Sequence, residues 1–424
     1  MIAIYNVLLP FLLFGARLAA IFNPKIRRGL AGRKSLLEEI RTHYASTTIQ
    51  GLRILIHVAS FGELEQAKPV ISALKARNPA AHIHLTFFSP SGYENAIGKY
   101  MDPDLITYAP LDMRSVVSRF LNMVKPDLVL FTRYDVWPNM ARELNRRNIT
   151  AILFTATAAE GVLRKIPIFG GFYRDTFRSL TKILAVSDED RERFLAMGLE
   201  PDKVEVAGDT RFDQVLARRN AINASGEQVL PKMTRDKIAE LGTLVLVVGS
   251  SWPSDEALYF PALKESVERN DNILTIVAPH ETGEERVRKL LAEFPGNALR
   301  LSSIEEWAGE PVIVVDSIGK LFGLYRYADV AMIGGGFGAG LHNILEAAVW
   351  GVPTIVGPRH EKSREVATLI DRIAAFEIKT TREFDFVFWR LAKSEDLRET
   401  AGAQATHFVE ENTGATARII HDLS

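Results

Sequence analysis

The sequence predicts an α/β protein with two doubly wound domains, each built on a parallel sheet that helices cover. After residue 50, ten short runs rich in β-branched residues alternate with amphipathic stretches. The runs are continuously apolar, which is typical of parallel strands buried on both faces. The chain has 424 residues with 47% hydrophobic and 24% charged content, which is too long for one ordinary core. Two α/β domains of similar size are therefore expected.

An apolar segment opens the chain, from Ile2 to Phe22, and only Asn6, Pro10 and Arg17 interrupt it. Its length is about what a helix needs to cross a hydrocarbon core. Basic residues cluster directly after it, within residues 25–34, whereas a secretory signal carries its positive charge before the apolar run. We predict a membrane anchor over residues 1–24, which either spans the bilayer or lies among anionic headgroups with the protein body on the cytoplasmic side. A buried helix of the first domain is the alternative.

The strands divide into two sets around a polar segment without strand signal, residues 213–242, which is the expected interdomain linker. The first domain, residues 25–212, takes the predicted strands 53–60, 82–88, 127–132, 149–155 and 181–186. The second domain, residues 243–424, takes 243–249, 272–278, 311–315, 329–335 and 353–357. Doubly wound domains bind ligands at the carboxyl ends of their strands, and in a tandem pair we expect these ends to face a common cleft. Reactive groups are therefore sought just after strands.

Composition excludes several classes of protein. A formal net charge of −1 gives no overall basic excess, so nucleic acid is not an expected partner. The chain has no cysteine, which excludes disulfides, thiolate metal sites and a cysteine nucleophile.

Glu63 lies in the stretch HVASFGELEQAKPVI, residues 57–71, where the first predicted strand ends and a helix begins. Its place at a helix N-terminus on the carboxyl side of the strand points it toward the cleft. Backbone amides there are expected to lower the pKa of the carboxyl and keep it ionised, which suits a general base. The structural alternative is an ordinary first-turn acid that complements the helix dipole.

A glycine-rich loop follows the strand 329–335, within MIGGGFGAGLHNILEAAVWGVPTIVGP, residues 332–358. It contains Gly334, Gly335, Gly336, Gly338 and Gly340 and leads into a predicted helix from His342 to Trp350. Glycine amides at a helix N-terminus can cradle a phosphate, and His342, Asn343 and Glu346 are expected on the first turns. The alternative is a tight turn, and the loop lacks the dinucleotide fingerprint G-x-G-x-x-G.

Taken together, several segments resemble the 3-deoxy-D-manno-octulosonic acid (Kdo) transferases of lipopolysaccharide synthesis. The matching segments are IHVASFGELEQAKPVI, FFSPSGYENA, TRYDVWPN, AGDTRFD, GSSWPSDE and GLHNILEAAVWGVPTIVGP. The resemblance implies a GT-B fold, CMP-Kdo as donor, a lipid A precursor as acceptor, no cofactor or metal, and a place on the bacterial inner membrane. The first domain would bind the acceptor and the second CMP-Kdo.

The resemblance also implies roles for single residues. The family's base, the glutamate of its Ser-x-Gly-Glu turn, falls on Glu63. Substrate contacts are implied for Ser60, Gly62, Ser89, Ser91, Gly92, Asp135, Arg211, Ser250, Ser251, His280, Gly335, Gly336, His342, Asn343 and Glu346. Glu346 resembles the acid that holds nucleotide ribose hydroxyls in many GT-B enzymes, and Arg211 with the loop would stabilise the departing phosphate.

Three positions depart from the commoner family pattern. Asp135 stands where a Glu is usual, Trp252 where a His is usual, and Arg211 where a Lys is usual. Two alternatives to Kdo transfer remain. One is another GT-B nucleotide-sugar enzyme, either a UDP-sugar transferase or an epimerase. The other is a catalytically silent membrane-bound protein that binds a nucleotide sugar.

Overall fold

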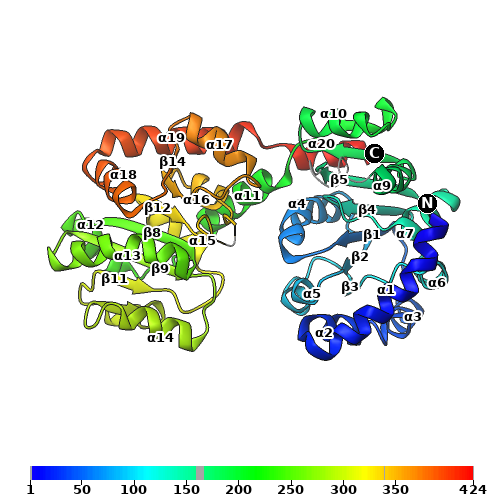
Figure 1. Cartoon of the computed structure of the whole chain (residues 1–424), viewed down its shortest axis with the longest axis horizontal. Coiled ribbons are helices and arrows are strands. Elements are labelled where there is room, and N and C mark those ends of the chain that lie inside the picture. The colour runs from blue at the N-terminus through cyan, green and yellow to red at the C-terminus, as the bar shows by residue number, and fades with distance from the viewer. Residues whose placement is uncertain (1, 159–166, 339, 424) are drawn as a thin grey trace. The chain divides into compact units, whose positions relative to one another are not determined.

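The computed structural model describes residues 2–158, 167–338 and 340–423, and the chain divides into two compact units (Figure 1). Unit 1 comprises Met1–Gln214 and Asn412–Ser424, and unit 2 comprises Val215–Glu411. Each unit contains one sheet of seven parallel strands with helices on both faces, as Figure 1 shows. The predicted α/β class with two doubly wound domains is confirmed.

Unit 1 has the strand order β3-β2-β1-β4-β5-β6-β7. Its strands are β1 Arg53–Val58, β2 His82–Phe87, β3 Leu105–Tyr108, β4 Leu128–Thr132, β5 Thr150–Ala156, β6 Lys182–Ala185 and β7 Val204–Val206. Its helices are α1 Ile2–Phe22, α2 Pro24–Ala31, α3 Leu36–Ser46, α4 Phe61–Arg77, α5 Pro90–Ala96, α6 Arg114–Val124, α7 Pro138–Arg146, α9 Pro167–Arg178, α10 Asp188–Ala196, the 3₁₀ turn η1 Pro201–Lys203 and α20 Ala415–Asp422. The strand order reverses direction between β1 and β4.

Unit 2 has the strand order β10-β11-β9-β8-β12-β13-β14. Its strands are β8 Leu244–Ser251, β9 Ile273–Pro279, β10 Ala298–Arg300, β11 Val312–Val314, β12 Val330–Ile333, β13 Thr354–Val356 and β14 Ala375–Glu377. Its helices are α12 Lys232–Leu241, α13 Pro253–Glu268, α14 Glu284–Ala292, α15 Leu321–Leu324, α16 Leu345–Ala348, α17 Arg364–Asp371, α18 Thr381–Lys393 and α19 Glu395–Glu411, with 3₁₀ turns η2 Leu301–Glu306 and η3 Tyr325–Tyr327. Here the order reverses between β8 and β12.

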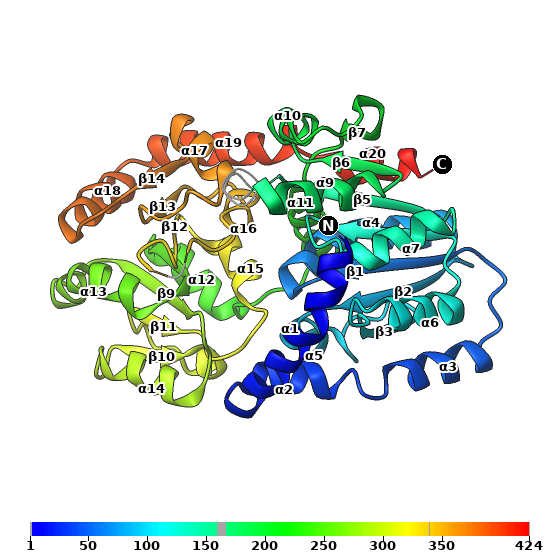
Figure 2. The ribbon, with the colours of Figure 1, turned by 45° about the vertical axis from the view of Figure 1, so that its right-hand side comes forward.

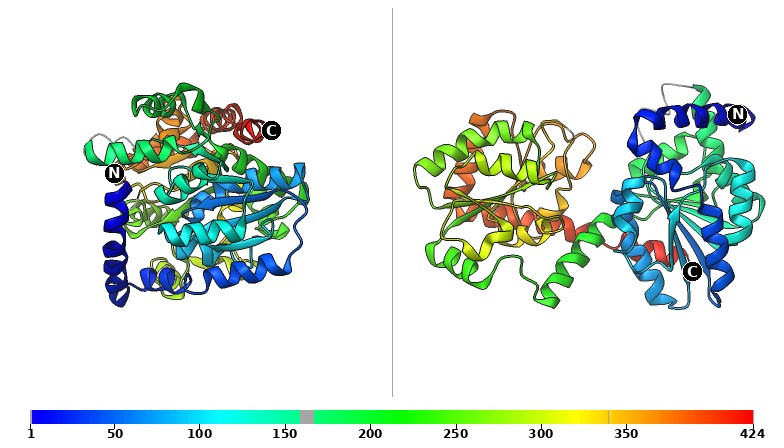
Figure 3. Two further views of the ribbon diagram at one scale, coloured as in Figure 1. Left: turned by 90° about the vertical axis from the view of Figure 1, so that its right-hand side faces the viewer. Right: turned by 90° about the horizontal axis from the view of Figure 1, so that it is seen from below.

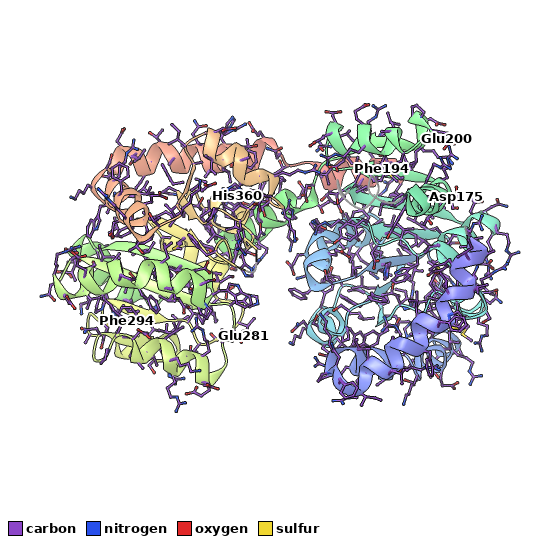
Figure 4. The ribbon with its side chains drawn as sticks, in the orientation of Figure 1. Asp175, Phe194, Glu200, Glu281, Phe294 and His360 are labelled. Atoms are coloured by element: carbon purple, nitrogen blue, oxygen red, sulfur yellow. The ribbon has the colours of Figure 1, made fainter. Side chains whose placement is uncertain are left out.

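The central strands are buried on both faces, which explains their continuously apolar sequence. In β1, Ile54 and Ile56 belong to one core of unit 1, whereas Leu55 belongs to the core on the opposite face. Phe194 of α10 lies in this second core, edge-on to Phe177 at 5.5 Å between ring centroids (Figure 4). Unit 2 has a corresponding core that contains Phe294, also labelled in Figure 4.

The boundaries of the units differ from the expected domains at the C-terminus. Residues 412–424 were expected in the second domain, but they belong to unit 1. Asp213 accounts for the difference, because its carboxylate accepts hydrogen bonds from the amides of Gly414 and Thr416, both at 2.6 Å. Helix α20 then packs against α4 and buries Ile419 in a core of unit 1. The right-hand view of Figure 3 shows the C-terminus in that unit.

The expected linker, residues 213–242, contains no strand, as predicted, and it is largely helical. It holds most of α11 Thr210–Ser225, which begins in unit 1 and continues in unit 2, followed by α12.

Candidate active site

The functional residues expected in unit 1 gather at the carboxyl ends of β1, β2 and β4, where the strand order reverses. Ser60 to Glu63 follow β1, Ser89 to Gly92 follow β2, and Asp135 follows β4. This edge of a doubly wound sheet leaves a crevice because the connections diverge on either side of the reversal. The topology therefore places these residues where such folds bind ligands.

Glu63 occupies the first turn of α4 and is 4% exposed. Its Oε2 atom accepts a hydrogen bond from the amide of Ala59 at 2.5 Å, and its own amide donates to Oγ of Ser60 at 3.4 Å. Burial raises the pKa of Glu63, and this effect outweighs the bond from Ala59, which lowers it. The expected lowered pKa was therefore wrong in direction, because the carboxyl is desolvated as well as bonded to an amide.

Three charged or ionisable neighbours act on Glu63. Asp135 raises its pKa, whereas His57 and Arg133 lower it. Nε2 of His57 lies 3.1 Å from Oδ2 of Asp135, and Nδ1 lies 3.0 Å from Oγ1 of Thr86. Thr86 Oγ1 donates in turn to the carbonyl of Ile56 at 3.2 Å. Glu63 thus lies within the electrostatic influence of a polar network formed by His57, Asp135 and Thr86 at this edge of the sheet.

Sequence reasoning missed His57, Thr86 and Arg133. A signal was present for His57, because a histidine inside the apolar run RILIHVAS is a polar group that must be buried and bonded. The register pairs His57 with Thr86 across β1 and β2. Arg133 has a left-handed backbone conformation, with φ of 69°, which a non-glycine residue rarely adopts and which no sequence pattern revealed.

The other expected residues of unit 1 have partners that suggest structural roles beside any ligand contact. Ser60 is the N-cap of α4. Ser89 Oγ lies 2.9 Å from Ser91 Oγ, and the Ser89 amide donates to the carbonyl of Ala59 at 2.8 Å. A Cβ atom on Gly92 would lie 2.7 Å from the Phe87 ring, so close packing alone requires this glycine, whereas Gly62 is exposed.

Arg211 lies in the first turn of α11, and Asp209 holds its side chain. The Nε atom donates to Oδ2 of Asp209 at 2.8 Å, and the backbone amide donates to Oδ1 at 2.9 Å. Its side chain is 32% exposed. Arg211 is therefore a preoriented cation of unit 1 that still reaches solvent.

In unit 2, the expected residues gather where β8 and β12 meet, at the reversal of that sheet. Strand β8 ends with Ser250 and Ser251, Trp252 follows it as the N-cap of α13, and the glycine-rich loop follows β12. The helix after the loop is shorter than expected, because α16 begins at Leu345 and ends at Ala348. His342 and Asn343 thus belong to the loop, and the expected helix from His342 to Trp350 is wrong, whereas phosphate binding by the loop stays a prediction. Ala339 lies outside the described residues.

Packing and backbone conformation explain why three positions of the loop are glycines. A Cβ atom on Gly334 would lie 2.3 Å from the carbonyl of Ser250, and one on Gly336 would lie 2.7 Å from the amide of Gly357. Gly335 has φ of 91°, a conformation that favours glycine. These contacts support the turn-making interpretation of the glycines themselves.

The loop amides are mostly bonded within the protein. Asp255, which is fully buried in the first turn of α13, accepts from the amides of Gly335 at 2.8 Å, Trp252 at 2.9 Å and Phe337 at 3.4 Å. Its carboxylate thus already occupies the position of an anion beneath the loop, a role that the sequence did not reveal. Within residues 334–338 and 340–343 of the loop, the amides of Gly336, Leu341 and Asn343 have no hydrogen-bond acceptor. A phosphate would have to use these amides.

Trp252, His280 and His342 form an aromatic cluster beside the loop. The rings of Trp252 and His280 stack at 4.2 Å between centroids, and Nε1 of Trp252 donates to Nε2 of His342 at 3.1 Å. Burial, together with the nearby His280, lowers the pKa of His342 to about 4. The neutral His342 can therefore accept from Trp252. The tryptophan that replaces the usual family histidine is bonded into the structure.

The remaining expected residues of unit 2 differ in their surroundings. Ser251 is buried, and its Oγ donates to Oε1 of Glu256 at 3.0 Å and lies 3.0 Å from the hydroxyl of Tyr259, so its ligand contact stays a prediction. Ser250 is half-buried with φ of 55°. Asn343 is exposed, and Glu346 accepts from Arg218 at 3.3 Å. Glu281, labelled in Figure 4, belongs to the loop after β9 that also carries His280.

Metal ligands were not expected at either site. In residues 2–158, 167–338 and 340–423, no three His, Asp or Glu side chains are grouped so that they could hold a metal ion.

The comparison with protein families decides which enzymes this chain is related to. Residues 28–214 match the family model described as 3-deoxy-D-manno-octulosonic-acid transferase, or Kdo transferase. Residues 28–214 are a domain of the Kdo transferase family. The matched segment contains Glu63 and its network, and the suspected resemblance is confirmed.

Individual Kdo transferases extend the similarity beyond this domain. The 3-deoxy-D-manno-octulosonic acid transferase of Haemophilus influenzae is 24% identical over 97% of this chain and 94% of its own. The enzyme of the same name from Chlamydophila psittaci is 28% identical over 73% of this chain and 70% of its own. These relatives support glycosyl transfer of Kdo as the activity.

Solved structures support the fold. The crystal structure of UDP-GlcNAc 2-epimerase from Neisseria meningitidis bound to UDP-GlcNAc superimposes with a TM-score of 0.61, covering 87% of this chain and 99% of that one. The two sequences are 16% identical, so this likeness concerns the GT-B fold alone.

Proposed function

We propose that this protein transfers Kdo from CMP-Kdo to the lipid A precursor lipid IVA, inverts the anomeric carbon, and uses Glu63 as the general base. The observation that carries the proposal is a buried carboxyl with a raised pKa at the sheet reversal of a Kdo transferase domain. Perturbed carboxyls in such positions are candidates for acid-base chemistry. The donor, the acceptor and the stereochemistry come from the family resemblance.

Glu63 removes the proton from a primary hydroxyl of the acceptor glucosamine as that oxygen attacks the anomeric carbon of Kdo. The new C–O bond forms on the face opposite the departing CMP, which leaves with the electron pair of the broken bond. A carboxylate with a raised pKa is a stronger proton acceptor than an ordinary one, and it is still ionised at neutral pH if the pKa stays below the working pH. The amide of Ala59 holds one oxygen of Glu63 in place.

Unit 2 holds the nucleotide in this proposal. The three unbonded loop amides, at Gly336, Leu341 and Asn343, contact the phosphate, and Arg211 of unit 1 adds a positive charge as CMP departs. His280 and His342 line the pocket beside the Trp252 ring. Glu346 contacts the ribose, and it either keeps its bond to Arg218 or gives that bond up when the nucleotide binds. No metal or other cofactor takes part.

The membrane supplies the acceptor. Helix α1 has a mean hydropathy of 1.8 over its most apolar part, and only 6% of that part is buried. This exposure does not fit a buried core helix, the alternative considered from the sequence. We place the protein at the cytoplasmic face of the bacterial inner membrane, where a soluble nucleotide sugar and a lipid acceptor can meet.

The deciding experiment incubates the purified full-length protein with CMP-Kdo and lipid IVA in detergent, and then measures the products by mass spectrometry. A mass gain of one or more Kdo residues on the lipid and release of CMP support the proposal. A parallel incubation with UDP-GlcNAc tests for transfer or epimerisation. Product from UDP-GlcNAc and none from CMP-Kdo would replace the proposal with the other GT-B enzyme class.

A silent binding protein gives a third outcome. CMP-Kdo would bind, as calorimetry measures it, but no lipid product would form at any enzyme concentration. The Glu63→Gln variant is the matched control, because in a true transferase it should bind the donor like the wild type and lose product formation.

A further inference from the structure

Helix α1 is tied to the body of unit 1 at its N-terminal end. The hydroxyl of Tyr5 donates to Oδ2 of Asp112 at 2.9 Å, and Asn139 Nδ2 donates to Oδ1 of Asn6 at 2.7 Å. Asp112 is itself buried and accepts from the amides of Asn139 and Met140, both at 2.9 Å. These polar groups of α1 therefore meet a preformed polar site at the N-terminus of α7.

The C-terminal end of α1 is tied to the same unit through α2. Asn23 caps α2, and its Oδ1 accepts from the amide of Lys25 at 3.0 Å. Arg33, just after α2, donates to the carbonyls of Ala109, Phe88 and Gly29. Since Tyr5 and Phe22 are about 25 Å apart along a helix, both ends of α1 can meet unit 1 only if the helix lies along its surface. Figure 2 and the left-hand view of Figure 3 show α1 in that position.

The outward face of α1 is apolar and has no partner in the described structure. Its large side chains are at least half exposed, including Ile4 at 58%, Phe11 at 71%, Phe14 at 61% and Leu18 at 50%. The inward face carries Leu9, the one buried residue of the helix. An apolar face of this size on the surface of a protein marks a contact with a membrane or another protein.

A basic pocket beside α1 identifies the partner. It has a volume of about 440 Å³ and is lined by residues of α1 and α2, the segment after α2, and Leu111. Its charged lining residues are Arg17, Arg27, Arg33 and Lys34, and no acid lines it. Arg17, Arg27 and Lys34 have no ion-pair partner anywhere in the described chain. Cations beside an apolar face match the phosphates and acyl chains of an anionic lipid leaflet.

We propose that α1 lies along the membrane surface without crossing it, and that the pocket between α1 and α2 holds the phosphate of an anionic phospholipid. The inference rests on the proposed membrane association and decides its geometry. Crossing the bilayer would break the bonds of Tyr5 and Asn6 with unit 1 and carry Arg17 into the hydrocarbon, where a cation is costly. Lying flat keeps both bonds and leaves Arg17 at headgroup level.

The geometry can be measured directly because the chain has no cysteine of its own. Ile4→Cys, Phe11→Cys and Leu18→Cys are spaced by seven residues and share the outward face, about 10 Å apart along the helix. Each full-length variant is labelled with a fluorophore, bound to preformed vesicles, and quenched by lipids that carry quenchers at known depths. A flat helix places all three labels at one shallow depth. Depths that change stepwise from residue 4 to residue 18 would mean that α1 spans, which overturns the inference and leaves membrane association intact.

A second experiment measures the affinity of the protein for phosphatidylcholine vesicles and for vesicles that contain about one third phosphatidylglycerol. We expect tighter binding to the anionic vesicles, and Arg17→Gln combined with Arg27→Gln should weaken it by about fivefold per cation, roughly 25-fold in all. Lys99→Gln combined with Lys125→Gln removes the same charge elsewhere on unit 1 and is the matched control. Equal binding to both vesicle types, or equal losses in the two double variants, would overturn the phosphate pocket. No binding to any vesicle would instead overturn the proposed membrane association itself.

Discussion

Nε2 of His57 lies 3.1 Å from Oδ2 of Asp135, and the two residues shift the pKa of Glu63 in opposite directions. Asp135 is the residue that departs from the glutamate usual in the family, and its shorter side chain still reaches the histidine. Because Asp135 and His57 contact each other, changing one also changes the field that the other exerts on Glu63. We regard both as positioning residues for the base.

Glu63→Gln should lower turnover by roughly two to four orders of magnitude while CMP-Kdo still binds, because the amide cannot accept the proton. The glutamine oxygen can still accept from the Ala59 amide, so the fold of the first turn should persist. Steady-state turnover and donor affinity are measured in parallel.

The matched control for this change is Glu65→Gln on the same helix, whose carboxylate pairs with Lys68 at the surface. It should keep near wild-type turnover. Near wild-type turnover in Glu63→Gln would mean that the carboxyl only caps α4, and the proposed mechanism would fail. An acceptor-binding measurement on the mutant separates loss of the base from loss of acceptor positioning.

The acidic limb of the pH-rate profile should report the ionisation of Glu63. The base is active only when ionised, so activity should rise with pH through its pKa, which lies above the ordinary value. Asp135→Asn removes a negative neighbour and should move the limb to lower pH. Arg133→Met removes a positive neighbour and should move it to higher pH. Shifts in the same direction would contradict the assignment, since a general loss of structure has no reason to produce opposite signs.

Gly336→Ala should lower the stability of unit 2 by about 1–3 kcal/mol, because the new methyl group would press on the backbone of Gly357. The fall is measured by chemical denaturation. Gly283→Ala is the control, since a Cβ atom there meets nothing within 4 Å. If Gly336→Ala is as stable as the control and binds CMP weakly, the glycine serves the ligand and not the packing.

All ten strands expected from the sequence are present, and the four that were missed are β3, β7, β10 and β14. These are the edge strands of the two sheets. An edge strand pairs on one side only, and here it is short, three or four residues in each case. It therefore needs no long apolar run, and the pattern that reveals central strands is absent.

The candidate site was only partly predictable for a similar reason. The sequence placed Glu63 and the glycine-rich loop after the correct strands, because order along the chain determines those positions. The pKa of Glu63 and the bonds of Asp255 depend on burial and on partners distant in sequence, such as Asp135 and Gly335. The expected helix from His342 also failed, since apolar spacing cannot distinguish a one-turn helix from a long one.

The stability of unit 1 should fall in acid because of His84. This residue is fully buried in β2, and burial lowers its pKa to about 3. The unfolded chain binds a proton near the ordinary pKa of histidine, whereas the folded chain does not until the pH is near 3. The free energy of unfolding is therefore unaffected by His84 above the ordinary pKa and declines as pH falls toward 3. Between pH 8 and pH 5, one such histidine lowers the free energy of unfolding by about 2 kcal/mol.

The measurement is the free energy of unfolding at several pH values. In His84→Leu, the free energy of unfolding should depend less steeply on pH between pH 4 and pH 6, by an amount that corresponds to about one proton. An unchanged slope in His84→Leu would show that another group dominates the acid response.

Tyr5→Phe should raise the pKa of Asp112 above its value of about 6. Burial is the main cause of that raised pKa, and the hydrogen bond from the Tyr5 hydroxyl lowers it, as do the amides of Asn139 and Met140. Removing the hydroxyl removes one donor to the ionised carboxyl, so protonation should become easier and the titration should move to higher pH. Carbon NMR of the Asp112 carboxyl follows the titration.

Tyr93→Phe serves as the control, because the Tyr93 ring stacks on Tyr108 in the same unit without a hydrogen bond from its hydroxyl to any described residue. It should leave the pKa of Asp112 where it is. If Tyr5→Phe also leaves it there, Tyr5 does not contact Asp112 in solution, and only the bond between Asn6 and Asn139 remains to hold the N-terminal end of α1 against α7. Since that contact is one of two bonds that hold the N-terminal end of α1 on unit 1, its absence would favour a helix that can leave the protein surface.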